Sequence, residues 1–491
     1  MIVITRILVA VYGVLFGVMG LGFWLAPDRL GARLGVSAID VAGVSTLRGD
    51  FGGAFLLLSA LCLFGLWRRS RVLLGLGAAL LGLIVAGRLL SWAATGDPAG
   101  LIPNLPIELV GALSLALHAR AVGDGAGPRR PWRAAAVSVL VVAGVVVAGA
   151  MALNTPAVQD RLLATFVHQA VAKDTAPLMK DDALRLALCG TSAPLPSTRR
   201  AKACAAVIAG GRIYIVDVGP ESVENLMLWG LPLGRVDGVL LTHFHSDHIG
   251  DLGELNLQTW VQGRPGPLAV YGGPGVERVV AGFSEAYALD QVYRTAHHTA
   301  QQMPPQTWPL QARPVAMPVG VAAPTAVVLD RDGLRITAIE TNHDPVRPAY
   351  AYRFDYKGRS LVITGDTTAD PRLTAAARGA DIFMSEALNR EMIRTLESAA
   401  RDTGRERVAH IMRDIQSYHI SPTEAAEAAN TAGAKLLVLY HLLPAPDNPL
   451  LQATFRRGLR DVRKGRWDIA EDGSLYTLPL GTDEVRIGRV P

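Results

Sequence analysis

The sequence predicts two structurally different parts, an all-α membrane bundle followed by an α/β domain in which strands and helices form a sandwich. Of the 491 residues, 50% are hydrophobic and only 19% are charged, against about 25% charged residues in ordinary soluble domains. Long apolar, charge-free runs are confined to the first 159 residues, and short β-rich runs alternate with helical or loop segments beyond about residue 181. We therefore expect a membrane domain over residues 1–155, a connector over 156–180 and a second domain over 181–491.

Five segments of the first part are apolar enough to cross a bilayer, which takes about 20 helical residues. The first is longer than the apolar core of a signal peptide and no cleavage site is evident, so we interpret it as a span. The third continues past Arg88, and the fourth contains Glu108. The predicted spans cover residues 7–27, 51–67, 72–94, about 101–119 and 134–159.

Arginines in the short loops predict the orientation, because basic loops stay in the cytoplasm. One group lies between the second and third spans and another between the fourth and fifth, namely Arg68, Arg69, Arg71, Arg120, Arg129, Arg130 and Arg133. The second domain is then expected on the outer, periplasmic side of a bacterial inner membrane. The first loop opposes this orientation, since its three arginines are only partly offset by acidic residues.

Arg88 and Glu108 both lie inside predicted spans, where an ionisable side chain is costly unless it is paired. A structural ion pair between adjacent helices is the favoured interpretation, because no second polar cluster accompanies them. A functional role, such as transport, is the alternative. We assign no chemistry to the membrane domain.

Three cysteines bear on the compartment of the protein. Cys62 lies in an apolar run, whereas Cys189 and Cys204 flank the segment GTSAPLPSTRRAKA, where two neighbouring strands could bring them together. Such a disulfide forms only in an oxidising compartment. The cysteine pair and the arginine distribution therefore predict the same outer location by independent arguments.

Three histidines and an aspartate lie within six residues, directly after the apolar run DGVLL. They are His243, His245, Asp247 and His248, in the segment THFHSDH. Side chains at the end of a strand, where the chain turns, can converge on one point. Imidazoles and carboxylates without thiolates suit a catalytic rather than a closed structural metal site. This set of ligands favours zinc, and manganese or iron would bind if they were the metal ions available.

This segment resembles the H-x-H-x-D-H motif of the metallo-β-lactamase superfamily, and the resemblance covers about residues 183–480. The further motifs of that superfamily follow in order at Asp217, His343, Asp366 and His441. The resemblance implies an αββα sandwich and two divalent metal ions that share a hydroxide, the nucleophile. It implies a first metal on His243, His245 and His343, a second on Asp247, His248 and His441, and Asp366 bridging both.

The resemblance also implies roles around these ligands. Asp217 would orient a ligand imidazole, and Asp247 would take part in catalysis as well as in metal binding. His419 occupies the place of a histidine in the ribonuclease Z and arylsulfatase-like branch, where it would donate a proton to the leaving oxygen or stabilise the oxyanion. Glu386 could orient His419, and the alternative for this region is a capped helix start.

The expected function is hydrolysis of a small phosphodiester or sulfate ester by a membrane-anchored enzyme. Lactone or β-lactam hydrolysis and a non-catalytic sensor domain are alternatives. Processing of tRNA is disfavoured because His343 and Asp366 are only 23 positions apart, which leaves no room for the tRNA-gripping arm of ribonucleases Z. The net charge of +5 comes from scattered arginines, so we expect nucleic acid to be an unlikely partner.

Two segments between the motifs are also interpreted. The Pro-rich stretch 303–324 is expected to form a surface loop or lid. His297 and His298 are expected in an exposed loop, with contact to the substrate as the less favoured alternative. Substrate identity and oligomeric state stay open.

Overall fold

The computed structural model describes residues 2–27, 30–31, 34, 36, 41–95, 105–122, 155–171 and 173–491. The chain divides into two compact units, Met1–Ala172 and Lys173–Pro491. The division falls inside the segment that the sequence predicts as a connector, and the first part of that segment is the helix α8 (Pro156–Val171). Each unit is described by itself below.

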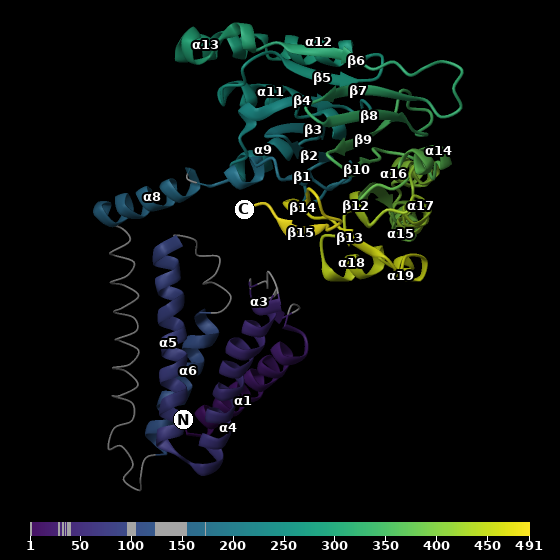
Figure 1. Ribbon diagram of the computed structural model, residues 1–491. Helices are drawn as coiled ribbons and strands as arrows, with labels where there is room; N and C mark the ends of the chain where they lie inside the picture. The colour runs from purple at the N-terminus through teal and green to yellow at the C-terminus, as the bar shows by residue number, and fades with distance from the viewer. Residues whose placement is uncertain are drawn as a thin grey trace. The chain divides into compact units, whose positions relative to one another are not determined.

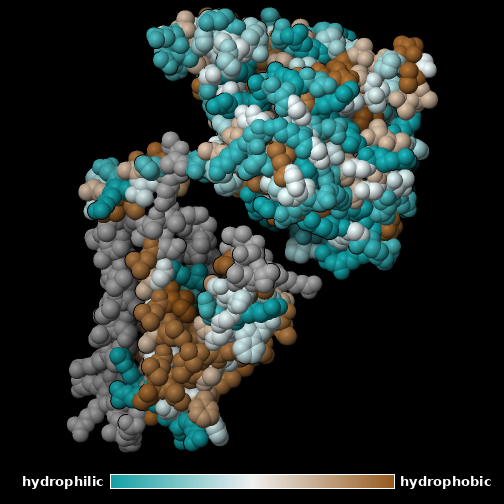
Figure 2. Space-filling view, viewed as in Figure 1, coloured by the Kyte–Doolittle hydropathy of each residue, from teal (hydrophilic) through white to brown (hydrophobic). Residues whose placement is uncertain are grey.

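The first unit is entirely helical in its described part (Figure 1). Its other helices are α1 (Ile2–Leu25), α3 (Val41–Thr46), the π-helical turn η1 (Leu47–Gly52), α4 (Gly53–Arg68), α5 (Arg71–Thr95) and α6 (Leu105–Ala121). Three stretches, Ile2–Leu25, Gly43–Arg68 and Arg71–Leu90, are long and apolar enough to cross a membrane. Figure 2 shows the hydrophobic surface that these helices present. The predicted fourth span is the shorter α6, and the fifth lies almost entirely outside the described residues.

Small residues let α1 approach α4 closely. A Cβ atom added at Gly20 of α1 would lie 2.6 Å from Leu56 Cγ and 2.9 Å from the Leu56 backbone nitrogen. Further along the same contact, Ser59 Oγ donates a hydrogen bond of 2.7 Å to the Gly13 carbonyl oxygen. Close backbone contact over small residues is a typical way for apolar helices to pack in a bilayer, where lipid offers no hydrophobic driving force.

The two ionisable residues of the predicted spans form an ion pair between α5 and α6. Arg88 Nε lies 2.8 Å from Glu108 Oε1 and 2.7 Å from Oε2. The pair satisfies the carboxylate and the guanidinium together, as expected for charges placed among apolar helices. The structure therefore favours the structural interpretation of these two residues.

The second unit contains two β-sheets. In spatial order, the first sheet consists of β15 (Arg486–Arg489), β14 (Ser474–Pro479), β1 (Ala183–Gly190), β2 (Cys204–Ala209), β3 (Arg212–Val218), β4 (Val236–Leu240), β5 (Leu268–Gly272) and β6 (Leu310–Pro314). The second consists of β13 (Arg466–Ile469), β12 (Leu436–Leu443), β11 (Ile382–Leu388), β10 (Arg359–Ile363), β9 (Tyr350–Tyr356), β8 (Leu334–Glu340) and β7 (Thr325–Arg331). Strands β3 to β6 are parallel, as are β10 to β13, and the remaining pairs are antiparallel.

Helices cover the outer face of each sheet (Figure 1). Those connected with the first sheet are η3 (Ala176–Met179), α9 (Ser222–Leu228), η4 (Leu233–Arg235), α10 (Ser246–Ile249), α11 (Leu252–Val261), α12 (Val276–Ala286), α13 (Ala288–Gln302) and η5 (Pro305–Thr307). Those connected with the second are α14 (Pro371–Ala376), α15 (Arg390–Asp402), α16 (Glu406–Asp414), η6 (Ile415–Ser417), α17 (Pro422–Thr431), α18 (Pro449–Phe455) and α19 (Leu459–Val462).

Side chains alternate between the two faces of each strand, and the hydrophobic core follows this alternation. In β1, Leu184, Leu186 and Leu188 enter the core between the two sheets, whereas Ala187 and Cys189 face the helical layer. Inner strands such as β2 (CAAVIA) are buried on both faces because helices cover the sheet outside, so their sequences are continuously apolar. This arrangement confirms the predicted αββα sandwich.

Two of the expected loops contain regular structure. The Pro-rich stretch 303–324 includes the edge strand β6, which begins after Pro309 and ends at Pro314; an edge strand tolerates proline at its ends. His297 and His298 lie on the helix α13 rather than in a loop, although the structure leaves them exposed as expected. Their segment has helical periodicity, which its polar composition obscures.

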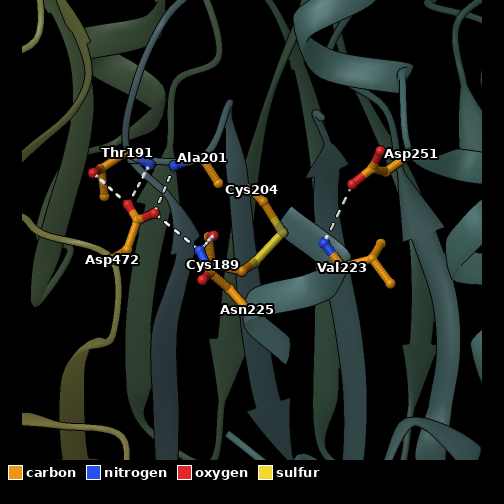
Figure 3. The surroundings of a disulfide bond; sticks show 8 residues. All are labelled: Cys189, Thr191, Ala201, Cys204, Val223, Asn225, Asp251 and Asp472. Atoms are coloured by element: carbon orange, nitrogen blue, oxygen red, sulfur yellow. Dashed lines mark hydrogen bonds between the residues drawn. A yellow bond between two sulfur atoms is a disulfide. The ribbon is translucent and has the colours of Figure 1, made fainter. Parts of the chain in front are cut away.

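Cys189 and Cys204 form a disulfide between β1 and β2, 15 positions apart (Figure 3). Beside it, Asp472 accepts hydrogen bonds from the Thr191 backbone nitrogen, at 3.0 Å, and from the Ala201 backbone nitrogen, at 2.7 Å. The disulfide and the Asp472 carboxylate thus both hold together the two ends of the loop between β1 and β2. The Thr191 carbonyl oxygen in turn accepts from the Leu442 backbone nitrogen at 2.9 Å, next to the predicted ligand His441.

Replacing both Cys189 and Cys204 with serine is expected to lower the free energy of unfolding of the second unit by about 3 kcal/mol, the chain-entropy value for a loop of this length. Thermal unfolding of the full chain, with and without reductant, measures this. Reductant should lower the Tm of the wild type and leave that of the double variant unchanged. Cys62→Ala is the control, and an equal response of all three proteins to reductant would contradict the prediction.

Candidate metal centre

The predicted metal ligands come from loops and strand ends that meet at one edge of the sandwich. His243 and His245 follow β4, His343 follows β8, Asp366 follows β10, and His441 lies within β12. The backbone of His441 has a positive φ of 44°, which a residue with a Cβ adopts at a cost. Such a conformation re-aims the side chain within an otherwise regular strand.

Three groups of possible ligands form among the described residues; two match the predicted metal sites and Asp366 faces both, and the third is Asp366, Glu386 and His419. The first group is His243, His245, His343 and Asp366, and the second is Asp247, His248 and His441, with candidate ligand atoms within 4.8 Å of one another in each. Asp366 Oδ2 lies 3.9 Å from His243 Nε2 and 3.8 Å from His343 Nε2. Its other oxygen, Oδ1, lies 3.5 Å from His248 Nε2 and 3.4 Å from His441 Nε2.

The site fits a pair of divalent cations. His343 Nε2 and Asp366 Oδ1 are buried and have no hydrogen-bond partner among the described residues. Unpaired buried polar atoms cost about 1–3 kcal/mol each. A cation in the first group would bind His343 Nε2 and one in the second would bind Asp366 Oδ1, which would remove that cost. The donor set of imidazoles and carboxylates is one that zinc, manganese and iron accept.

Asp217 lies behind the second group, at the end of β3. It accepts hydrogen bonds of 2.8 Å from the Thr242 backbone nitrogen and from Thr242 Oγ1, and its Oδ2 lies 2.8 Å from His248 Nδ1. A carboxylate on the far nitrogen fixes both the orientation and the tautomer of a ligand imidazole. Burial alone would lower the pKa of His248, but Asp366, Asp217 and Asp247 raise it well above its usual value.

The structure also identifies two residues that the sequence motifs did not reveal. Thr242 Oγ1 lies 3.1 Å from His243 Nδ1, and the Tyr418 carbonyl oxygen lies 3.0 Å from His343 Nδ1. The Tyr418 ring packs against His343 and His419, with ring centroids 5.3 Å and 4.9 Å apart. Thr242 could have been found as the residue directly before the motif, whereas the contact of Tyr418 with His343 joins positions 75 apart in the sequence.

His419 and Glu386 form a buried pair beside the two groups. His419 Nδ1 lies 2.8 Å from Glu386 Oε1 and 3.9 Å from Asp366 Oδ2. Burial lowers the pKa of His419, but the carboxylates of Glu386 and Asp366 outweigh it and raise the pKa to about 9. Glu386 Oε1 also accepts from the backbone nitrogens of Thr367, at 3.1 Å, and Ile420, at 3.3 Å, so this carboxylate is held firmly.

The cap of α17 does not involve His419. Ser421 Oγ accepts from the Glu424 backbone nitrogen at 3.3 Å, and the Glu424 carboxylate accepts from the Ser421 backbone nitrogen at 2.8 Å. This reciprocal capping box satisfies the start of the helix. The imidazole of His419 is therefore available to the site.

Comparisons with known proteins agree with the fold. A profile described as a β-lactamase superfamily domain matches residues 212–442. The ribonuclease Z of Mycobacterium marinum is 34% identical over 266 residues, which are 53% of this chain and 87% of that protein. The ribonuclease Z of Mycolicibacterium gilvum is 35% identical over 265 residues, covering 53% and 85%. The solved short form of human tRNase Z has a TM-score of 0.42 and 21% identity, covering 60% of this chain and 99% of its own.

These relatives correct one expectation. The prediction that nucleic acid is an unlikely partner is wrong, because it relied on the scattered arginines and on the missing arm, whereas the relatives that align over most of their length are ribonucleases. Identity of this level over more than four-fifths of a relative shows common ancestry over the aligned 266 residues. The chain belongs to the metallo-β-lactamase superfamily of hydrolases, with the ribonucleases Z among its homologues.

Proposed function

We propose that this protein hydrolyses phosphodiester bonds with two divalent metal ions, most readily zinc, and that RNA is among its substrates. The observation that carries the proposal is the His419–Glu386 pair, held beside the carboxylate that faces both ligand groups. The homology to ribonucleases Z supports the choice of a phosphodiester. The sulfate ester, lactone and β-lactam alternatives have no corresponding support.

The chain's own residues supply positioning and a proton. The two ligand groups would hold the ions, with Asp366 between them, and the ions would polarise the phosphate and lower the pKa of a bound water. His419 Nδ1 is engaged by Glu386, so Nε2 is the nitrogen left to donate a proton to the leaving oxygen as the phosphorus–oxygen bond breaks. Asp247, whose Oδ2 lies 3.2 Å from His441 Nε2 in the second group, would be the carboxylate that accepts a proton from the attacking water.

We propose further that the catalytic unit lies outside the cytoplasm, anchored by the helices of the first unit. Three helices of sufficient length and apolarity support the anchor, and the Cys189–Cys204 disulfide supports an oxidising compartment. Thiol labelling of native membranes under denaturing conditions tests the location. Both cysteines should resist labelling until reductant is added, and free thiols at both positions would contradict the proposal.

Substrate choice is tested with the full chain in detergent, loaded with zinc or manganese. Turnover of an RNA with a 3′ extension, of bis(p-nitrophenyl) phosphate and of p-nitrophenyl sulfate is compared, with Asp366→Asn as the inactive reference. We expect hydrolysis of the RNA and the phosphodiester and none of the sulfate. Preference for the sulfate, or no turnover of any ester despite two bound metal ions, would contradict the proposed function.

A further inference from the structure

A lysine without a carboxylate partner lies at the rim of the candidate metal centre. Lys202 precedes β2 by two positions and is half-buried. Its Nζ donates a hydrogen bond of 2.8 Å to the Leu195 carbonyl oxygen, and no carboxylate of the described residues forms an ion pair with it. An ammonium group has three protons to donate. Two of these protons are therefore left for solvent or for a ligand.

The backbone of Lys202 is held against the segment that carries the second ligand group. Its nitrogen donates to the Pro220 carbonyl oxygen at 3.0 Å. A Cβ atom added at Gly219 would lie 2.6 Å from Lys202 Cβ and 2.1 Å from the Asp247 carbonyl oxygen. Only a residue without a Cβ atom allows this approach. The side chain of Lys202 therefore begins beside a predicted metal ligand.

The other end of the Lys202 side chain lies on the side of the proposed proton donor. Leu195, whose carbonyl oxygen accepts from Nζ, packs in the same small apolar cluster as Tyr418. The Tyr418 ring in turn lies 4.9 Å from the ring of His419 and 5.3 Å from that of His343. Lys202 is thus directed from the second ligand group toward the side of the centre where the leaving oxygen would receive its proton.

Three arginines near the centre already have carboxylate partners, in contrast to Lys202. One follows His343 by four positions, one pairs with the aspartate four positions after Asp366, and one donates to the His419 carbonyl oxygen at 3.2 Å. The three ion pairs are Arg347–Asp344, Arg372–Asp370 and Arg390–Glu424. Compared with these arginines, Lys202 is the side chain whose positive charge no described carboxylate offsets.

We propose that Lys202 Nζ binds the phosphate that flanks the scissile phosphodiester of an RNA substrate and so positions the strand over the two ligand groups. The inference rests on the proposed function, which places the scissile phosphate at those groups. The flanking phosphate is assigned because Nζ forms an ion pair with neither Asp247 nor Asp366, the carboxylates of the two groups. Contacts to phosphates fix the register of a nucleic acid strand without reading its sequence.

The test measures RNA binding to the full chain in detergent after metal removal, so that no turnover occurs. The fluorescence anisotropy of a labelled RNA with a 3′ extension is followed at several salt concentrations. Lys202→Met keeps most of the bulk of the side chain and removes its charge, so it should weaken binding about tenfold. The slope of log Kd against log salt should fall by about 0.7–0.9, the value for one phosphate contact. Lys202→Arg should keep most of the affinity and the slope.

Lys464 offers a matched control. Its Nζ also donates to a backbone carbonyl oxygen, that of Arg460 at 2.9 Å, and no described carboxylate pairs with it. It precedes β13, which runs parallel to β12 and therefore begins at the edge of the sheet opposite the end of β12 where His441 lies. Lys464→Met should change neither the affinity nor the slope. A merely structural role of Lys202 would lower the affinity without changing the slope.

The zinc-loaded enzyme gives a second readout. Lys202→Met should raise KM for RNA about tenfold and affect bis(p-nitrophenyl) phosphate less, since that ester has no flanking phosphate. Hydrolysis of RNA together with binding whose salt slope Lys202→Met leaves unchanged would overturn this inference alone. Binding that depends on Lys202, without hydrolysis of any phosphodiester, would support the inference and contradict the proposed function. Absence of RNA binding to the wild type would overturn the inference.

Discussion

Replacing Asp366 with asparagine is expected to abolish hydrolysis, with a loss of about 10³-fold or more in kcat. Its two oxygens face different ligand groups, at 3.8–3.9 Å from His243 and His343 and at 3.4–3.5 Å from His248 and His441. Outer-sphere partners alone are worth about 10- to 100-fold in metal affinity or activity, so a residue between both groups should exceed that. The amide also lacks the charge that offsets two divalent cations.

The chain offers a matched control four residues later. Asp370 is buried too, but its Oδ1 accepts from the Arg372 backbone nitrogen at 2.8 Å as the cap of α14. Asparagine caps helices as well as aspartate does, so Asp370→Asn should keep both metal ions and full activity. Metal content by mass spectrometry and kcat are measured together. Two retained metal ions and near wild-type kcat in Asp366→Asn would show that the carboxylate does not join the two groups.

Much of the candidate metal centre could be proposed from the sequence because its residues occupy short motifs at strand ends. His243, His245, Asp247 and His248 are neighbours in the sequence, and they come just after the apolar residues Val239, Leu240 and Leu241. The sequence could place Asp366 and His441 only through the family resemblance, since nothing local marks them as ligands. Their convergence depends on β10 and β12 lying in one sheet, which is a long-range property.

The structure adds what local patterns cannot contain. Short edge strands such as β15 and β6 carry little periodic signal, and β6 lies in a Pro-rich stretch that predicts a loop. The contact of Tyr418 with His343 and the bracing of the His441 strand by Thr191 both join distant segments. The nucleic-acid prediction was wrong for a related reason, because net charge and one missing insertion say little about a substrate that metal ions would bind directly.

Replacing His419 with alanine is expected to lower kcat for RNA by about 10²–10⁴-fold, the usual contribution of a positioned general acid. The loss should depend on the leaving group. A ribose oxygen needs a proton as it departs, whereas nitrophenolate is a stable anion, so bis(p-nitrophenyl) phosphate should lose far less. His410→Asn is the control, since His410 is an exposed histidine of α16 that pairs with Asp414 at 3.0 Å.

Glu386→Gln tests whether Glu386 acts through His419 as a positioning residue. Glutamine preserves the shape of the side chain and removes the charge that holds His419 Nδ1 at 2.8 Å. We expect the same selective loss on RNA, smaller than that of His419→Ala, and no further loss when the two substitutions are combined, because both act on one proton. Equal losses on RNA and on bis(p-nitrophenyl) phosphate, with both metal ions retained, would instead show that the pair supports the ligand groups and donates no proton to the leaving oxygen.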